Sequence, residues 1–313
     1  MSGIDRLTPG MQAVMARLAE QAAGGPSRYA MPFAQARQVL EAQREWWQEG
    51  APAMASEREE SQRVGQRSIP VRFYRPAHLR SDVRFVYLHG GGFCIGSWKT
   101  HGAIMRWLAH ETGLEVVGVD YALAPEHPFP AGLEDCNAII DILLAKGHRL
   151  VVGGDSAGAN LALVNAMVRR DAGKPLPEAL VLYYGTFGPV RPGGSFAQWG
   201  GGDFGLSVAA LERYAAAYTP EFDSRADPRA APLAGELSGL PPALLVAAGC
   251  DPLLDDSIEL HERLIAKGSQ ARLIRYEGII HGYLAYWRML DEARQTFTET
   301  KKFLDGVFDL DAR

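Results

Sequence analysis

From about residue 58 to the C-terminus, short apolar runs alternate with segments whose apolar residues recur at helical spacing. Each run is five or six residues long, as is typical of buried strands. These predicted strands are 83–88, 116–120, 149–153, 179–184, 243–248 and 271–276, preceded by an antiparallel edge pair at 60–64 and 68–74. Helices are predicted at 133–145, 159–168, 257–266 and 284–303. Because strands and helices alternate, we predict an α/β fold with a mostly parallel sheet of about eight strands flanked by helices.

The first 55 residues have a different pattern, that of two amphipathic helices. Thr8-Pro9 is a typical helix start, with a capping hydroxyl followed by proline in the first turn. Gly24-Gly25 is predicted to end this helix, and a second helix is predicted at 34–48. Two helices of this size cannot form a core alone, so they pack on the remainder. We interpret residues 1–55 as a cap over a ligand site; the alternative is an arm that only stabilises the fold.

One connection is much longer than the others. Nearly sixty residues separate Tyr184 from Ala243, far more than a strand–helix–strand link requires. Its first part, 188–205, is rich in glycine and proline, and 208–218 is predicted to be helical. We therefore predict a main domain over 56–313 that carries a cap or lid insertion at about 188–240.

Composition and charge exclude several classes of function. The chain has 32 basic and 37 acidic residues, a net charge of −5, and no long basic run, so nucleic-acid binding is not expected. No apolar run approaches the roughly 18 residues of a membrane span, and the N-terminus lacks a signal-peptide pattern. Three cysteines, Cys94, Cys136 and Cys250, are too few for a disulfide framework or a zinc site. We expect a cytoplasmic protein.

The first candidate for chemistry is Gly154-Asp155-Ser156-Ala157-Gly158, which has G-x-S-x-G spacing. A predicted strand precedes it and a predicted helix follows. A serine in such a turn has strained backbone and an exposed hydroxyl beside a helix N-terminus, as a nucleophile requires. The alternative is an ordinary glycine-rich turn. Asp155 is expected to make a structural hydrogen bond.

The second candidate is His89-Gly90-Gly91-Gly92-Phe93, directly after a predicted strand. Three glycines let backbone N–H groups approach an anion closely. A phosphate loop is the rival interpretation, but Gly96 is followed by Ser97 and not by the lysine of a Walker loop. An oxyanion site is therefore favoured, with His89 bracing the loop.

Two further residues complete a possible catalytic triad. A nucleophile elbow requires an acid and then a histidine, each after a strand. Asp251 follows the strand ending at Ala248 and is preferred to Asp255 and Asp256, which would open the next helix. His281 follows the last predicted strand, whereas His261 lies within a predicted helix. In this scheme Ser156 attacks a carbonyl, His281 transfers the proton and Asp251 orients the imidazole.

Together these motifs resemble the hormone-sensitive-lipase-like branch of the α/β-hydrolases, the bacterial carboxylesterases and acetyl esterases. The match comprises the HGGG motif at 89–92, the GDSAG(AN) elbow at 154–160, a DYALAPEHPFPA stretch at 120–131, DPL-x-D at 251–255 and HGY at 281–283. Two positions depart from the pattern, with Ala122 for arginine and Tyr283 for phenylalanine. The resemblance implies an α/β-hydrolase fold, an oxyanion hole formed by Gly91, Gly92 and Ala157, no metal and no cofactor.

The resemblance also implies a small ester as substrate, and we expect a carboxylesterase for short to medium acyl chains. Rival functions are an amidase or arylformamidase with the same triad and, remotely, a non-catalytic binding module. Aromatic residues predicted to line the substrate pocket, with ordinary core packing as the alternative, are Phe93, Phe187, Trp199, Phe204 and Tyr214. The sequence leaves open a homodimer and the cis or trans state of the Ala124-Pro125 and Phe129-Pro130 bonds.

Overall fold

The computed structural model describes residues 3–22, 27–221 and 227–309. Its strands form one eight-stranded sheet in the order β1-β2-β4-β3-β5-β6-β7-β8, which confirms the predicted α/β fold. The strands are β1 (Ser56–Val64), β2 (Arg67–Arg75), β3 (Arg84–Leu88), β4 (Glu115–Val119), β5 (Leu150–Asp155), β6 (Ala179–Tyr183), β7 (Ala243–Cys250) and β8 (Ala271–Ile280). β2 pairs antiparallel with β1 and β4, and every other pairing is parallel.

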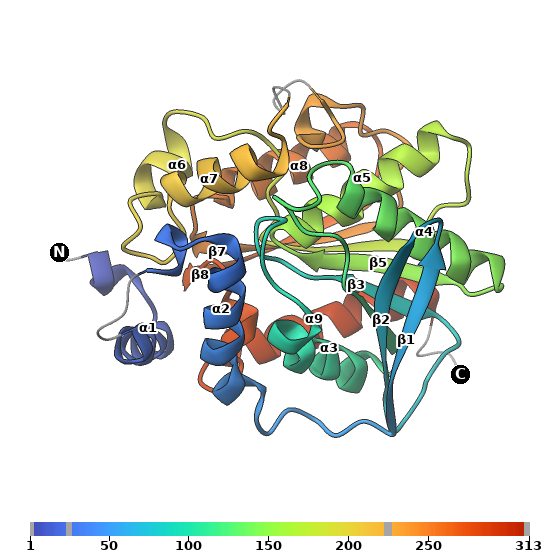
Figure 1. Cartoon of the computed structure of the whole chain (residues 1–313), viewed down its shortest axis with the longest axis horizontal. Helices are drawn as coiled ribbons and strands as arrows, with labels where there is room; N and C mark the ends of the chain where they lie inside the picture. The colour runs from blue at the N-terminus through green and yellow to red at the C-terminus, as the bar shows by residue number, and fades with distance from the viewer. Residues whose placement is uncertain (1–2, 23–26, 222–226, 310–313) are drawn as a thin grey trace.

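Helices cover both faces of the sheet (Figure 1). One face packs on α4 (Ala131–Ala145), α5 (Ala157–Asp171) and α8 (Leu254–Ala266), and the other on α3 (Trp98–Thr112) and α9 (Asp291–Phe308). Along β3, Phe85 and Tyr87 face the second layer while Val86 and Leu88 face the first, as strand geometry requires. Because both faces are covered, β4 to β7 are buried along their whole length, which explains their continuous apolar sequences.

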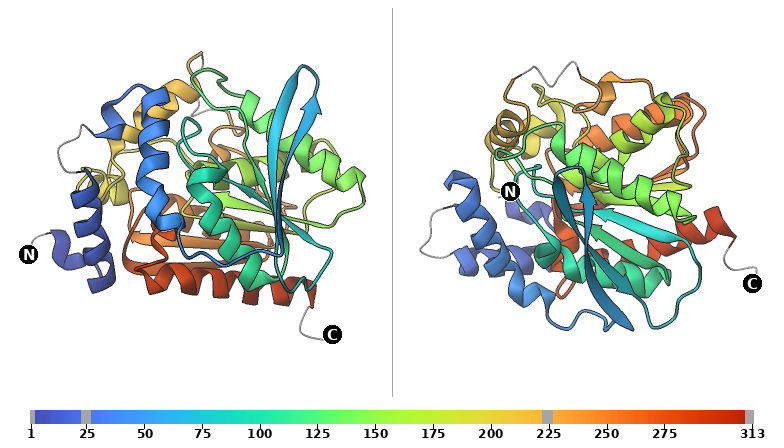
Figure 2. Two further views of the ribbon diagram at one scale, coloured as in Figure 1. Left: turned by 60° about the horizontal axis from the view of Figure 1, so that its bottom comes forward. Right: turned by 45° about the vertical axis from the view of Figure 1, so that its right-hand side comes forward.

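The N-terminal segment and the long connection lie side by side at one end of the sheet (Figures 1 and 2). The first contains η1 (Gly3–Arg6), α1 (Pro9–Ala22), η2 (Arg28–Ala30) and α2 (Phe33–Gln48). The second contains α6 (Gly194–Trp199), α7 (Val208–Tyr218) and η3 (Pro232–Ala234). Arg213 of α7 donates to the carbonyls of Tyr29 and Met31, which ties the two segments together. Gly24 and Gly25, expected to end the first helix, lie outside the described residues.

The structure corrects the prediction for the last helix. The pattern predicted a helix over 284–303, but a 3-10 turn, η4 (Tyr283–Tyr286), comes first and α9 begins at Asp291. Leu290 is extended, and Asp291 and Glu292 occupy the first turn of α9, where acidic side chains favour the helix dipole. Residues 283–287 are all buried, and their apolar sequence therefore resembles that of a helix in the core. Both Ala124-Pro125 and Phe129-Pro130 are cis.

Further features bear on the excluded functions. No helix among the described residues is both long and apolar enough to cross a membrane. Over the same residues, no cluster of three or more histidine, cysteine or acidic side chains is arranged to hold a metal ion. Cys94, Cys136 and Cys250 are buried free thiols.

Candidate active site

Ser156 lies in the tight turn between β5 and α5. Its φ of 54° and ψ of −117° are rarely adopted by residues other than glycine, and its N–H donates to the carbonyl of Tyr183 at 2.9 Å. The flanking glycines permit this turn, because a Cβ at Gly154 or Gly158 would lie 2.1 or 1.9 Å from the carbonyl oxygen of Leu88. The turn therefore presents the serine hydroxyl at the N-terminus of α5.

Asp251 and His281 meet Ser156 from the ends of two neighbouring strands. Asp251 follows β7 and is fully buried, and His281 follows β8. The distance from His281 Nδ1 to Asp251 Oδ2 is 2.7 Å, and that from His281 Nε2 to Ser156 Oγ is 3.0 Å. Asp251 Oδ1 also accepts from the N–H of Leu253, which fixes the carboxylate. This arrangement can transfer a proton from the hydroxyl to the imidazole.

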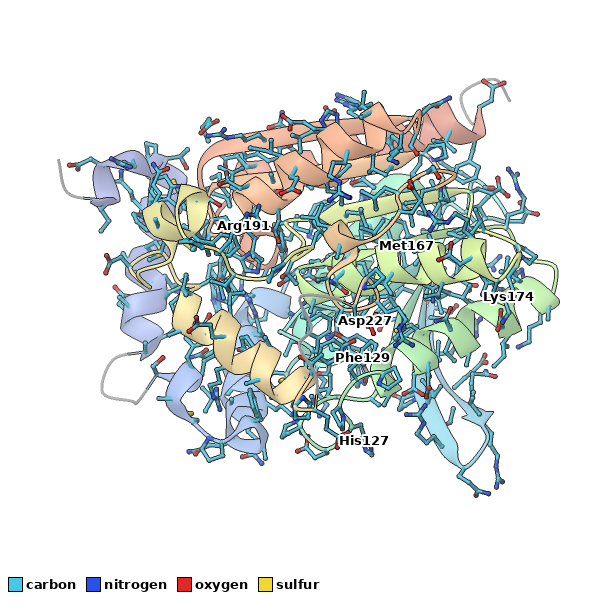
Figure 3. The ribbon with its side chains drawn as sticks, turned by 90° about the horizontal axis from the view of Figure 1, so that it is seen from above. His127, Phe129, Met167, Lys174, Arg191 and Asp227 are labelled. Atoms are coloured by element: carbon cyan, nitrogen blue, oxygen red, sulfur yellow. The ribbon has the colours of Figure 1, made fainter. Side chains whose placement is uncertain are left out.

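Asp255 and Asp256, the rival acids, open α8 and face the long connection instead. Asp255 accepts from the N–H of Ser195 at 2.8 Å. Asp256 accepts from the N–H groups of Phe187 and Gly188. It also pairs at 2.7 Å with Arg191, which is labelled in Figure 3. Burial raises the pKa of Asp256 to about 6 even though these donors act in the opposite direction. Both carboxylates anchor the connection to α8.

The glycine-rich loop after β3 lies next to Ser156. Gly91 and Gly92 have φ of 125° and 60°, and a Cβ at Gly91 would lie 2.1 Å from the carbonyl oxygen of Ile95. Within the described part of the chain, the N–H groups of Gly91 and Gly92 donate to no protein acceptor. Ala157 is the first residue of α5, where helix N–H groups lack internal partners. These three residues can supply backbone donors of the kind that an oxyanion requires.

A buried polar network supports this loop from below. Asp155 accepts from the hydroxyl of Tyr87 at 2.7 Å and from the N–H of Gly90 at 2.9 Å, and it lies 3.5 Å from His101 Nε2. The ring of His89 stacks on Tyr121 at 4.4 Å, and its Nδ1 lies 2.9 Å from the carbonyl oxygen of Gly90. Burial lowers the pKa of His89 to about 4. His89 and Asp155 therefore have structural contacts, as the sequence predicted.

Comparison with known proteins agrees with this architecture. Residues 85–285 match the family described as having the alpha/beta hydrolase fold. An acetyl esterase of Salmonella agona is 33% identical over 279 residues, covering 85% of each chain. The chain belongs to the α/β-hydrolase family.

Solved structures place this α/β hydrolase within a branch of the family. An ester hydrolase from the metagenome of Lake Arreo, complexed with a bipyridine phosphonate derivative, is 32% identical with a TM-score of 0.91 and covers 97% of this chain and 99% of its own. An esterase of the bacterial hormone-sensitive lipase family is 31% identical with a TM-score of 0.82, covering 95% and 97%. The resemblance to the hormone-sensitive-lipase-like branch is thereby confirmed.

Ser156 and His281 of this α/β hydrolase open into a cavity of about 410 Å³. Of the five aromatic residues predicted to line a pocket, Phe93 and Tyr214 line this cavity. The other three lie outside its wall and pack in the core: Phe187 lies against Gly185, while Trp199 and Phe204 pack edge to face at 5.1 Å.

Most other wall residues of the hydrolase were missed by sequence reasoning. They include Met15 and Leu18 of α1, Leu40 and Arg44 of α2, Arg28 of η2 and Leu211 of α7. Met15, Leu18 and Leu40 were visible as apolar members of amphipathic helices. The interpretation of residues 1–55 as a cap predicted that these helices face a ligand site, but it did not identify which of their residues line it. Arg28 and Arg44 belong to no motif and gave no signal.

Proposed function

We propose that the protein is a serine carboxylesterase that hydrolyses esters of short to medium acyl chains through an acyl-enzyme. The hydrogen-bonded chain from Ser156 through His281 to Asp251 is the observation that carries this proposal. The acetyl esterase and ester hydrolase relatives further support esters as substrates.

In the proposed reaction, Ser156 Oγ attacks the ester carbonyl while His281 accepts its proton. Asp251 holds the imidazole in position and stabilises its cation. The negative oxygen of the tetrahedral intermediate accepts hydrogen bonds from the N–H groups of Gly91, Gly92 and Ala157, each worth roughly 2.7–4 kcal/mol in the transition state. His281 then protonates the leaving alkoxide. In the second half of the reaction His281 accepts a proton from water as the water oxygen attacks the acyl carbonyl, and it returns this proton to Ser156 Oγ as the carboxylic acid is released.

The test is hydrolysis of p-nitrophenyl acetate, butyrate and longer esters by the wild type and by Ser156→Ala. We expect a loss of at least about 10⁴-fold in kcat and of labelling by a fluorophosphonate probe. Equal rates for the two proteins would reject Ser156 as the nucleophile. Matched ester and amide substrates provide the second comparison, since faster amide cleavage would assign the protein to the amidases.

A further inference from the structure

Two arginines interrupt the largely apolar wall of the cavity. Arg28 lies in η2, between the two N-terminal helices, and Arg44 lies on α2. Both side chains are half-buried. Gln43, beside Arg44, also lines the cavity and accepts from Arg28 Nη1 at 3.2 Å, so the two arginines belong to one polar region of the wall.

Neither guanidinium is neutralised by a carboxylate within the described residues. Arg28 donates to the hydroxyl of Tyr29 at 2.8 Å, and its guanidinium lies 4.7 Å from the centre of that ring. Its Nε is buried and has no hydrogen-bond partner in the part of the chain that the structure describes. The guanidinium of Arg44 lies 5.0 Å from the ring centre of Tyr286. In contrast, Arg37, also on α2, pairs with Glu126 at 2.6 Å.

The acidic residues of the cavity do not balance these charges. Asp155 already accepts from Tyr87 and Gly90 beneath the glycine-rich loop. Asp203 is exposed to solvent. An arginine keeps its proton at all ordinary pH values, and a partly desolvated cation without a counter-charge is unfavourable. The wall thus carries two guanidinium groups that no carboxylate of the described residues neutralises.

Aromatic rings connect this region to both sides of the candidate catalytic centre. Tyr286 belongs to η4, which begins two residues after His281. Tyr29 packs edge to face on Tyr214 at 6.4 Å, and Tyr214 covers Gly92, since a Cβ there would lie 2.3 Å from its ring. Ser156, His281 and the two arginines therefore line one cavity, and an ester bound at Ser156 shares that cavity with both guanidinium groups.

We propose that the cavity binds esters carrying a second, ionised carboxyl group at the end remote from the scissile bond, and that Arg28 and Arg44 bind this carboxylate. The guanidinium fork matches a carboxylate through two parallel hydrogen bonds. This proposal rests on the proposed esterase function and names its substrate class.

The experiment compares anionic esters with neutral esters of similar shape. Monomethyl and dimethyl esters of glutaric, adipic and suberic acids place the carboxylate on the acyl side. 6-Acetoxyhexanoate and hexyl acetate place it on the alcohol side. The readout is the ratio of kcat/KM for each anionic ester to that for its neutral counterpart, in the wild type, Arg28→Gln, Arg44→Gln and Arg28→Lys. Arg63→Gln, which removes an exposed arginine of β1 outside the cavity wall, is the matched control.

We expect the wild type to hydrolyse at least one anionic series as fast as its neutral counterpart. The ratio should fall about tenfold in each glutamine variant, less in Arg28→Lys, and not in Arg63→Gln. The series that shows the fall identifies the acyl or the alcohol side. Ratios that stay equal in all variants, or a wild type that rejects both anionic series, would overturn the proposal.

A binding measurement separates this proposal from the esterase proposal. Calorimetric titration of Ser156→Ala with monomethyl suberate and dimethyl suberate requires no turnover. We expect tighter binding of the anionic ester, weakened about tenfold when Arg28→Gln or Arg44→Gln is added. If the wild type hydrolyses no ester yet this difference is found, the esterase proposal fails and the anion site stands. Equal binding of the two suberates would reject the anion site.

Discussion

Asp251 and Asp255 are four residues apart, yet their surroundings give them different tasks. Asp251 is fully buried against His281, whereas Asp255 accepts from the backbone of Ser195. We expect Asp251→Asn to lower kcat by about 10⁴-fold, because an amide cannot stabilise the imidazolium or hold its tautomer. Asp255→Asn is the matched control and should change kcat less than threefold. A larger loss in Asp255→Asn than in Asp251→Asn would reverse the assignment of the acid.

Gly91 and Gly92 exclude a side chain for different reasons. At Gly91 a Cβ would meet the backbone oxygen of Ile95, whereas at Gly92 it would meet the side chain of Tyr214. We expect both alanine variants to lose about 10²–10³-fold in kcat by displacing an oxyanion donor. Tyr214→Ala should restore part of the activity of Gly92→Ala and none of that of Gly91→Ala, because only a side chain can be removed. Steady-state kinetics of the single and double variants on p-nitrophenyl acetate test this, and equal rescue of both would contradict it.

Single residues also show what the sequence could predict about the candidate site. Ser156, Asp251 and His281 were predictable because each follows an apolar strand in the order that the fold requires. Arg28 and Arg44 were not, because their meaning depends on which carboxylates lie nearby in space. Arg37 and Arg44 are both arginines of α2, yet of the two only Arg37 has an acidic partner among the described residues. No local pattern distinguishes them.

At the level of elements, the loop that follows β3 begins with the buried ring of His89, whose protonation is expected to affect stability. Burial and the neighbouring His101 lower the pKa of His89 from 6.5 to about 4. Between those two pH values the unfolded chain binds more protons than the folded one, so the folded state loses stability as pH falls. The complete loss amounts to about 3 kcal/mol. His89→Phe keeps a ring to stack on Tyr121 but cannot titrate.

We therefore expect the free energy of unfolding of the wild type, minus that of His89→Phe, to decrease as pH falls from 7 to 4. The measurement is urea unfolding at fixed pH values, compared through the free energy of unfolding. Taking the difference between the two proteins cancels the contribution to this pH dependence of the carboxylates that titrate in both. A difference independent of pH would show that His89 is protonated equally in the folded and unfolded states.

Elements differed in how well the sequence predicted them. The interior strands were predicted to within a few residues, because helices on both faces require continuous apolar runs. The turn η4 was mistaken for the start of the last helix, because Tyr283, Leu284 and Ala285 are as apolar as a core helix. These residues are buried because they pack against distant parts of the chain, and the periodicity of the local sequence gives no information about such contacts. The division of the chain into a cap and a main domain stays a prediction.

At the scale of the whole molecule, the cavity exists only because distant segments meet over Ser156. Its wall combines α1 and α2 with the loop after β3, α7 and the end of β8. No single segment encloses it. Its size of about 410 Å³ falls within the range of small-molecule sites and suits a short to medium ester. We therefore expect the length of ester that the cavity can hold to depend on the N-terminal helices as much as on the residues around Ser156.

This assembly leads to a test of where the acyl chain lies. Each methylene buried against α1 should raise kcat/KM about fourfold, from roughly 0.8 kcal/mol per CH₂, until the chain fills the cavity. Leu18→Trp enlarges a wall residue of α1 and should lower the octanoate-to-acetate ratio of kcat/KM at least tenfold with p-nitrophenyl esters. Leu79→Trp, at a side chain that is 39% exposed and outside the wall, is the control. An unchanged ratio in Leu18→Trp would mean that the acyl chain does not contact α1, and that this helix bounds the alcohol side of the substrate instead.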